Sequence, residues 1–155
     1  MRKKRAQRRE VSPDTQYGSI ALSRFINYIM EDGKKGVAES IVYGALKRLV
    51  SKEHSDALAV FDKAIENASP RFEVVSKRVG GANYQVPREV REDRKFFLAC
   101  KWIIDAARSG KGRTMEEKLA QEILAAFNGE GSAIKKKETI HKMAEANRAF
   151  AHFAR

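Results

Sequence analysis

The residues that most often carry catalysis or bind metals are few in this chain and poorly spaced for either role. His54, His141 and His152 are the only histidines, and none lies one helical turn from another, as a helical pair of metal ligands requires. The single cysteine, Cys100, cannot form a zinc cluster or an internal disulfide. It falls on an apolar helical stripe, which favours a buried structural thiol over a nucleophile. The sequence therefore predicts neither a metal site nor a catalytic thiol.

Two glycine-containing segments raise the question of nucleotide binding. Residues 110–114, Gly-Lys-Gly-Arg-Thr, resemble part of a phosphate-binding loop, but they lack the Gly-x-x-x-x-Gly-Lys-Ser/Thr spacing and follow no predicted strand. Gly80 and Gly81 indicate a turn and not a dinucleotide-binding fingerprint. The acidic residues are scattered over polar helix faces and suggest no acid/base pair. We therefore expect no cofactor, no small-molecule substrate and no enzymatic activity.

The positively charged residues are the ones whose number and spacing do indicate a chemistry. Lys and Arg total 31 against 20 Asp and Glu, which gives a net charge of +11 over 155 residues. Such an excess predicts a polyanionic partner, with nucleic acid favoured over an anionic membrane surface. The cations gather where helices end and loops begin, and there they can neutralise phosphates without reading sequence. The predicted phosphate contacts are Arg2, Lys3, Lys4, Arg5, Arg8, Arg9, Lys34, Lys35, Lys77, Arg78, Arg91, Arg94, Lys95, Arg108, Lys111, Arg113, Lys135, Lys136, Lys137, Lys142 and Arg148.

The N-terminal residues extend this positive surface. Residues 1–9 contain six cations and no acidic residue, and we expect a basic arm that orders on phosphate in preference to a solvated tail. Tyr84 is the only obvious aromatic candidate for base stacking, so a reader of single strands is not indicated. Recognition of folded RNA by shape and backbone fits better, although charge alone does not distinguish RNA from DNA.

Hydrophobic periodicity predicts that most of these charges lie on helices. Asp56 is expected to cap a third helix, and Thr114 with Glu117 to form a capping box for a fifth. The inward-facing residues of six helices are predicted to be Leu22, Phe25, Ile26, Ile29 and Met30; Val37, Ala38, Ile41, Val42, Ala45, Leu46, Leu49 and Val50; Leu58, Phe61, Ala64, Ile65 and Ala68; Phe96, Phe97, Cys100, Ile103, Ile104 and Ala107; Leu119, Ala120, Ile123, Leu124 and Phe127; and Ile140, Met143 and Ala144.

Between the third and fourth helices the period changes to that of strands. The Val-rich and aromatic runs at 72–79 and 84–90 predict a β-hairpin at about 72–90, with a four-residue loop at 80–83. Pro87 lacks an N–H, so its strand cannot lie inside a wide sheet, and so apolar-poor a ribbon is expected to project from the body. The predicted fold is mainly α, a six-helix single domain at 19–155 with a projecting two-stranded hairpin, preceded by a basic arm at 1–18.

Four segments carry a resemblance to a known family. They are Val-Gly-Gly-Ala-Asn-Tyr-Gln-Val-Pro at 79–87, Asp-Gly-Lys-Lys at 32–35, Ala-Glu-Ser-Ile-Val-Tyr-Gly-Ala at 38–45, and Met-Ala-Glu-Ala-Asn-Arg-Ala-Phe-Ala-His at 143–152. In this order they resemble the bacterial-type ribosomal protein seven of the small subunit, the universal ribosomal protein S7 family. The resemblance covers essentially the whole chain, and the hairpin segment is the most specific part of it.

The resemblance implies a structural constituent of the small ribosomal subunit that functions in translation. It implies a primary binder of 16S-type ribosomal RNA that nucleates assembly of the head, or 3′ domain, and lies near the tRNA exit site. Small-subunit proteins nine and eleven are the implied neighbours. The residues implied to lie near exit-site tRNA are those of the hairpin tip, Gly80, Gly81, Ala82, Asn83 and Tyr84.

Two observations bear on where the protein works. No apolar run approaches the ~20 residues needed to span a bilayer, so no membrane partner is expected. The basic N-terminus is not followed by the apolar segment of a signal peptide, and the single cysteine fits a reducing compartment. We expect a cytoplasmic ribosome, with a plastid ribosome as the alternative.

Two other classes of protein fit this sequence less well. An architectural DNA-binding protein also combines a basic helical body with a β-ribbon, but it usually carries an apolar wedge at the ribbon tip, where this chain has Gly-Gly-Ala-Asn at 80–83. An RNA-modifying enzyme needs a cofactor loop or a nucleophile–base pair, and the sequence suggests neither.

Overall fold

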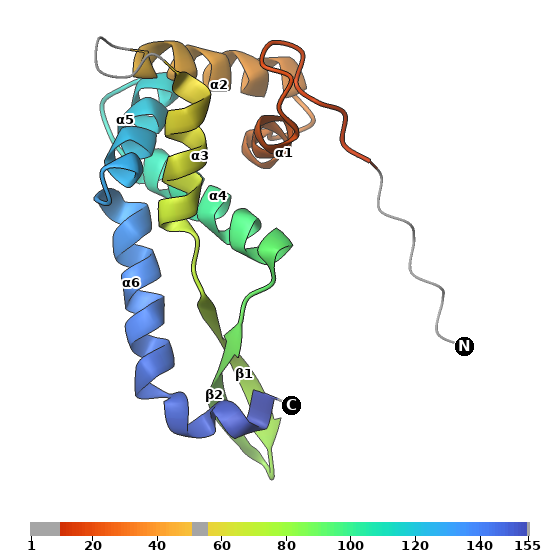
Figure 1. Cartoon of the computed structure of the whole chain (residues 1–155), viewed down its shortest axis with the longest axis vertical. Helices are drawn as coiled ribbons and strands as arrows, with labels where there is room; N and C mark the ends of the chain where they lie inside the picture. The colour runs from red at the N-terminus through yellow and green to blue at the C-terminus, as the bar shows by residue number, and fades with distance from the viewer. Residues whose placement is uncertain (1–9, 51–55, 155) are drawn as a thin grey trace.

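The computed structural model describes residues 10–50 and 56–154 and confirms the predicted mainly helical single domain with a projecting hairpin. In Figure 1, helices α1 to α5 gather at one end of the molecule, and the hairpin extends from the other end with α6 running beside it. The elements are α1 Ile20–Ile29, α2 Lys35–Leu49, α3 Ala57–Ala68, β1 Phe72–Val79, β2 Ala82–Glu89, α4 Glu92–Ser109, α5 Met115–Phe127, α6 Gly131–Ala146 and the short 3₁₀ helix η1 Arg148–Ala154.

The predicted helix starts are confirmed at two side-chain caps. The Asp56 carboxylate accepts the backbone N–H of Leu58 at 2.9 Å and so caps α3. The Thr114 hydroxyl accepts the backbone N–H of Glu117 at 3.4 Å at the start of α5. The Glu117 carboxylate, expected to complete a capping box, instead forms an ion pair with Arg48 of α2 at 3.4 Å. A contact with another helix has thus replaced the local one.

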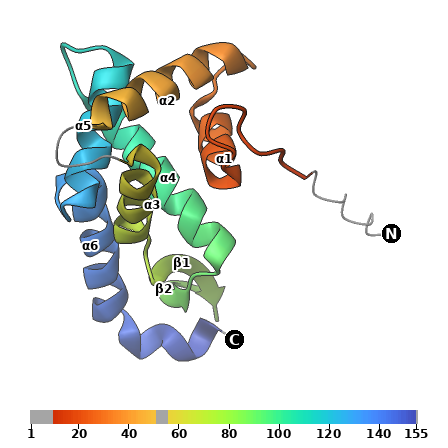
Figure 2. The same ribbon diagram turned by 45° about the horizontal axis from the view of Figure 1, so that its top comes forward.

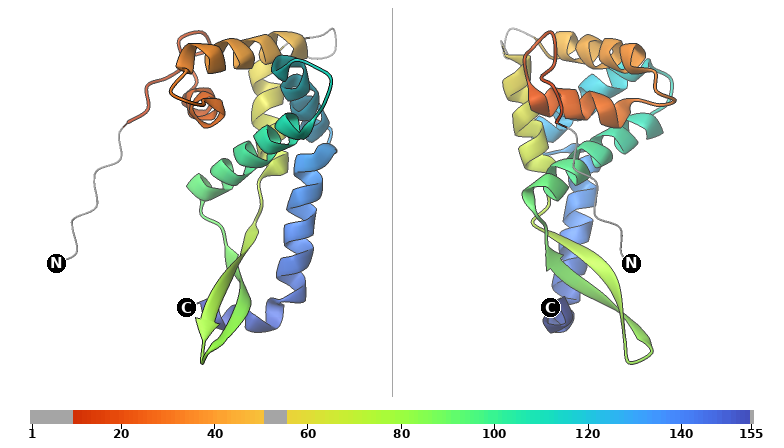
Figure 3. Two further views of the ribbon diagram at one scale, coloured as in Figure 1. Left: turned by 180° about the vertical axis from the view of Figure 1, so that it is seen from behind. Right: turned by 90° about the vertical axis from the view of Figure 1, so that its right-hand side faces the viewer.

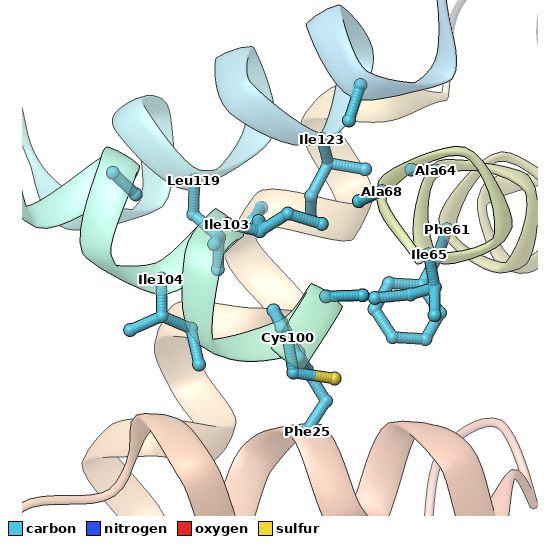
Figure 4. Close-up of a cluster of buried hydrophobic side chains, with 14 of the residues drawn as sticks. Phe25, Phe61, Ala64, Ile65, Ala68, Cys100, Ile103, Ile104, Leu119 and Ile123 are labelled. Carbon is cyan, nitrogen blue, oxygen red and sulfur yellow. The ribbon is translucent and has the colours of Figure 1, made fainter. Parts of the chain in front are cut away.

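The hydrophobic core lies where α1, α3, α4 and α5 meet, with α2 closing it from above. Figure 4 shows side chains of α3, α4 and α5 converging on α1, with Cys100 beside Phe25. The rings of Phe25 and Phe61 pack edge to face with centroids 5.0 Å apart, and both side chains are completely buried. Leu119 and Ile123 of α5 are buried to the same extent. The predicted stripes of these four helices are therefore largely confirmed.

The prediction is wrong for four residues expected to face inward, which are exposed because the neighbouring elements do not cover the whole of each apolar stripe. Val37 is 58 % exposed in the first turn of α2, and Val50 is 53 % exposed just beyond the last residue of that helix. Leu124 of α5 is 37 % exposed at the edge of its stripe. Met143 is 46 % exposed because α6 has left the body there, and the hairpin covers only the side that carries Ala144. Helical periodicity locates a stripe, but the neighbouring elements decide how much of it is covered.

The hairpin turn is shorter than predicted, with a loop of two residues and not four. Gly80 and Gly81 have φ angles of +56° and +90°, and a type I′ turn requires positive φ at both central positions. Ala82 and Asn83, expected in the loop, belong to β2 and pair with β1. Within the described residues the sheet has two antiparallel strands, so the strand that carries Pro87 lies at an edge. This agrees with the prediction from its missing N–H that it cannot lie inside a wide sheet.

The chain after α6 folds back toward the hairpin. The Asn147 side chain donates to the Met143 carbonyl at 2.8 Å where α6 ends. Helix η1 then packs against β2, and Figure 2 shows it running past the strands of the hairpin. This segment is too short and too exposed for an amphipathic pattern to reveal it.

The described residues of the predicted arm, 10–18, lie against the helical body at two side chains. Asp14 is 8 % exposed, and its carboxylate accepts the backbone N–H of Tyr17 at 2.7 Å and the hydroxyl of Tyr43. Tyr17 packs on the core, with its ring 6.1 Å from that of Tyr43. The division into an arm at 1–18 and a helical domain at 19–155 stays a prediction.

Candidate nucleic-acid interface

The predicted phosphate contacts on described residues fall into three groups: cations paired with exposed carboxylates, cations whose contacts stabilise the fold itself, and cations without a partner among the described residues. Six further predicted contacts belong to the N-terminal arm and lie outside the described residues: Arg2, Lys3, Lys4, Arg5, Arg8 and Arg9. The others lie on the loops between helices, on the hairpin and along α6. Most of the exposed ion pairs among them are weak, so pairing alone does not remove a cation from the surface.

The first group of cations is paired with carboxylates at the surface. Each of these pairs is at least partly exposed, and such a pair contributes about 0–1 kcal/mol, so exchange of the carboxylate for a phosphate costs little. The pairs are Lys34 with Asp32 at 3.6 Å, Lys35 with Glu39 at 3.9 Å, Lys95 with Glu92 at 2.5 Å, Arg108 with Glu31 at 2.7 Å, and Arg148 with Glu145 at 3.5 Å.

A tighter arrangement joins the hairpin to the start of α4. Glu73 of β1 receives hydrogen bonds from Arg88 at 2.7 Å and from Arg94 at 3.3 Å, while its own side chain is only 12 % exposed. Burial opposes ionisation of this carboxyl, but the two arginine hydrogen bonds outweigh it and lower the pKa of Glu73. The Arg94 guanidinium also lies 5.2 Å from the ring centroid of Phe97. Arg94 therefore fixes the hairpin base as well as adding positive charge.

Lys137 is the clearest case of a predicted phosphate contact that the fold itself uses. Its ammonium donates to the Asn67 carbonyl at 2.6 Å, near the C-terminal end of α3. Burial, together with the nearby Arg71, lowers the pKa of Lys137. The Asn67 amide donates in turn to the carbonyls of Ala126 and Phe127 at 3.1 and 2.9 Å. This network ties together the ends of α3 and α5 and the start of α6.

On the hairpin, the C-terminal segment occupies both residues that looked most available to a nucleic acid. The Lys77 ammonium donates to the Phe153 carbonyl at 2.6 Å. The Tyr84 ring, the predicted stacking candidate, packs against Phe150 and Phe153 with centroids 5.2 and 5.3 Å away. The outer hairpin thus offers Arg78 as its exposed cation without a hydrogen bond or ion pair among the described residues.

The last group consists of exposed cations whose side chains have no hydrogen bond or ion pair to another described residue. Of the predicted contacts these are Arg78, Arg91, Lys111, Lys135, Lys136 and Lys142. The sequence reasoning missed Lys47, Arg71 and Lys101, which have the same standing in residues 10–50 and 56–154. Arg71 and Lys101 have no adjacent cation in the sequence, whereas Lys47 precedes Arg48 in the last turn of α2, away from the loop clusters that carry the prediction. Arg113 is intermediate, since it donates to the Gln121 side chain at 2.9 Å.

The described part of the chain offers little to any other chemistry. Cys100 is buried, and burial raises the pKa of its thiol, which disfavours the reactive thiolate. Among residues 10–50 and 56–154 there is no group of three or more His, Cys, Asp or Glu placed to hold a metal ion. None of the described helices has the length and apolar character needed to cross a membrane.

A compact helical body, a projecting hairpin and a broad display of exposed cations define a basic protein of the nucleic-acid-binding class. Residues 1–148 match the family model described as ribosomal protein S7p/S5e, so the chain belongs to the ribosomal protein S7p/S5e family. Members of this family are structural constituents of the small ribosomal subunit, which is not a class of enzymes. The predicted family is therefore confirmed.

Curated relatives match the chain along nearly its whole length. The small ribosomal subunit protein uS7 of Fervidobacterium nodosum is 58% identical over 153 residues, which cover 99% of each chain. The protein of the same name from Thermotoga maritima is 54% identical over the same length and the same shares. The one from Afipia carboxidovorans is 54% identical over 152 residues, covering 98% of this chain and 97% of the relative.

Proposed function

We propose that this protein is a primary binder of small-subunit ribosomal RNA and nucleates assembly of the subunit head. Its exposed cations without protein partners carry the proposal, because they leave a polyanion-binding surface that the fold does not neutralise. Several of them lie along α6 and at the α4–α5 loop. Contacts of this kind position RNA by its backbone and release counterions, and they need no base recognition.

The second part of the proposal concerns the hairpin tip, which we place beside exit-site tRNA in the ribosome of the cytoplasm. The tip residues 80–83 are small, neutral and exposed, and Arg78 is the nearest unpaired cation. A neutral tip of this kind can lie next to a tRNA as a steric element, but it offers no charge to bind the phosphates of the tRNA. Small-subunit proteins nine and eleven are the proposed protein neighbours.

A salt titration tests the mode of binding. With on the order of six to ten phosphates neutralised, affinity for a head-domain ribosomal RNA fragment should fall about 10³- to 10⁵-fold between 50 and 200 mM salt. A duplex DNA of equal length serves as the competitor, and the RNA fragment should be preferred at moderate salt. An affinity that hardly depends on salt, or equal binding of the DNA, would contradict the proposal.

A matched pair of double variants tests which cations carry the binding. Replacement of the unpaired Lys135 and Lys136 by Gln should weaken RNA binding by about tenfold and reduce the salt slope by about two. The control variant replaces Lys63 and Lys118 by Gln, because neither lysine is among the predicted phosphate contacts. It loses the same net charge and should keep most of the affinity. Equal losses in the two variants would mean that net charge alone matters.

A further inference from the structure

Besides the contact of Glu73 with Arg94 of α4 at its base, the hairpin contacts two different parts of the C-terminal region, at two levels. At the base, His141 of α6 accepts the backbone N–H of Arg71 at 3.0 Å, and the Phe72 ring lies 6.4 Å from the imidazole. Further out, α6 has ended and η1 lies against β2. Figure 3 shows the hairpin leaving the body beside α6, so neither level draws on the helical core.

The outer contact is an aromatic cluster closed by one hydrogen bond. The Tyr84 ring packs against both Phe150 and Phe153, whose own rings are nearly parallel at an interplanar angle of 14°. Lys77 donates to the Phe153 carbonyl and stands directly opposite Tyr84 in the strand register. Residues opposite one another in an antiparallel pair project from the same face, so both leave the ribbon toward η1.

Neither partner in this contact belongs to the core cluster of the body. The strand residues Ser76, Lys77 and Arg78 are exposed and η1 has no buried residue, while Val86, at the inner end of this stretch, is buried outside that cluster. A two-stranded hairpin is marginally stable by itself in water, and so is a single 3₁₀ segment. Aromatic pairs contribute beyond their buried area, and two of them meet at Tyr84.

We propose that residues 147–154 act as a strap that holds the outer half of the hairpin and so fixes the direction of its tip. The strap defined in this way works through Phe150 and Phe153. The hairpin base keeps its own support from α6 through His141. Loss of the strap is therefore expected to release residues 75–86 while the base and the helical body stay folded. This inference goes beyond the proposed function, because it holds whichever RNA the protein binds.

Hydrogen exchange of the full-length protein tests the strap directly. The double variant Phe150→Ser, Phe153→Ser should exchange at least about tenfold faster in a peptide spanning residues 75–86, because two aromatic pairs are lost. The control variant Ala149→Ser, Ala151→Ser changes two exposed residues of the same segment and should exchange like the unaltered protein. Unchanged exchange at 75–86 in the double variant would overturn the proposal, and so would an equal acceleration at the hairpin base.

A second variant approaches the contact from the hairpin side. Tyr84→Ala leaves η1 intact in sequence, and by reciprocity it should accelerate exchange in residues 147–154 by a similar factor. Circular dichroism is expected to show unchanged helical content, since Tyr84 is not part of the core. If the strap kept its protection without Tyr84, the two segments would be ordered independently and the proposal would be wrong.

Discussion

Phe61 and Tyr84 both pack against other aromatic rings, yet they stabilise two regions of very different character. Phe61 is completely buried among α1, α3 and α4 in the body, whereas Tyr84 is half-buried on a hairpin that has no core of its own. In the body, order comes from apolar surface removed from water, and hydrogen-bonded caps refine it. In the hairpin and the strap, order comes from a few mutual contacts at the surface. A projecting hairpin can therefore be positioned without being part of a core.

The largest expected effect of a single substitution lies in the body. Phe61→Ala should reduce the free energy of unfolding by about 3–5 kcal/mol, because it leaves a cavity among residues that cannot fully collapse. Tyr84→Ala should change it by no more than about 1 kcal/mol. Chemical denaturation followed by far-ultraviolet circular dichroism measures both values. Similar losses in the two variants would contradict the distinction between the helical body and the hairpin with its strap.

A smaller effect is expected at the hairpin turn. Gly80 and Gly81 have positive φ angles, and valine is strained in that region, so Gly81→Val should destabilise the turn locally by about 1–3 kcal/mol. The melting temperature of the body should stay within about 2 °C of the unaltered protein, and hydrogen exchange at the tip should accelerate. A large drop in melting temperature would show that the tip is coupled to the core.

Deletion of the outer hairpin sharpens the comparison at the level of function. Replacing residues 77–86 with a short Gly linker removes two cations, of which only Arg78 is without a protein partner among the described residues. RNA affinity should therefore fall by the equivalent of about 1 kcal/mol. Reconstituted small subunits carrying the deletion should assemble their heads but differ in tRNA retention. Abolished RNA binding in a folded deletion protein would make the hairpin the anchor.

The smallest expected effect is a dependence of the hairpin base on pH. Burial first, and then the charges of Lys137 and Arg71, lower the pKa of His141 below its usual value. The unfolded chain then takes up the proton first, so the stabilising contact is complete above about pH 6.5 and weakens as pH falls through the lowered pKa. Protonation also removes the lone pair that accepts the Arg71 N–H.

Hydrogen exchange at residues 71–74 measured at pH 7.5 and 5.5, after correction for the intrinsic rate, should show this weakening. The other charged side chains around the imidazole are Glu89, Glu145 and Arg148, which line the same cleft. The matched control is His152→Gln, at an exposed position, which should leave the pH dependence unchanged, whereas His141→Gln should abolish it. A pH dependence that survives His141→Gln would assign it to another group.

The sequence predicts the structure of the helical body better than that of the hairpin and the strap, for physical reasons. The stripes around Phe25 and Ile103 recur at helical spacing over several turns, so their helices and burial could be predicted. The strap carries only Phe150 and Phe153, too few apolar residues to show a period. The pairing of Arg94 with Glu73 joins residues 21 positions apart, which no local pattern reveals. The predicted cations were therefore found by clustering, but the sequence could not show which of them the protein itself uses.

The network around Asn67 has a mechanical consequence for the whole molecule. It joins the ends of α3 and α5 to Lys137, which lies in the second turn of α6, and so holds that helix near its N-terminal end. From Lys137 to Ala146 the helix rises about 14 Å, and the strap follows at its far end. A tilt of about 5° at Lys137 displaces that end by about 1 Å. A change in the packing of the body that tilts α6 would therefore carry the strap, and with it the outer hairpin.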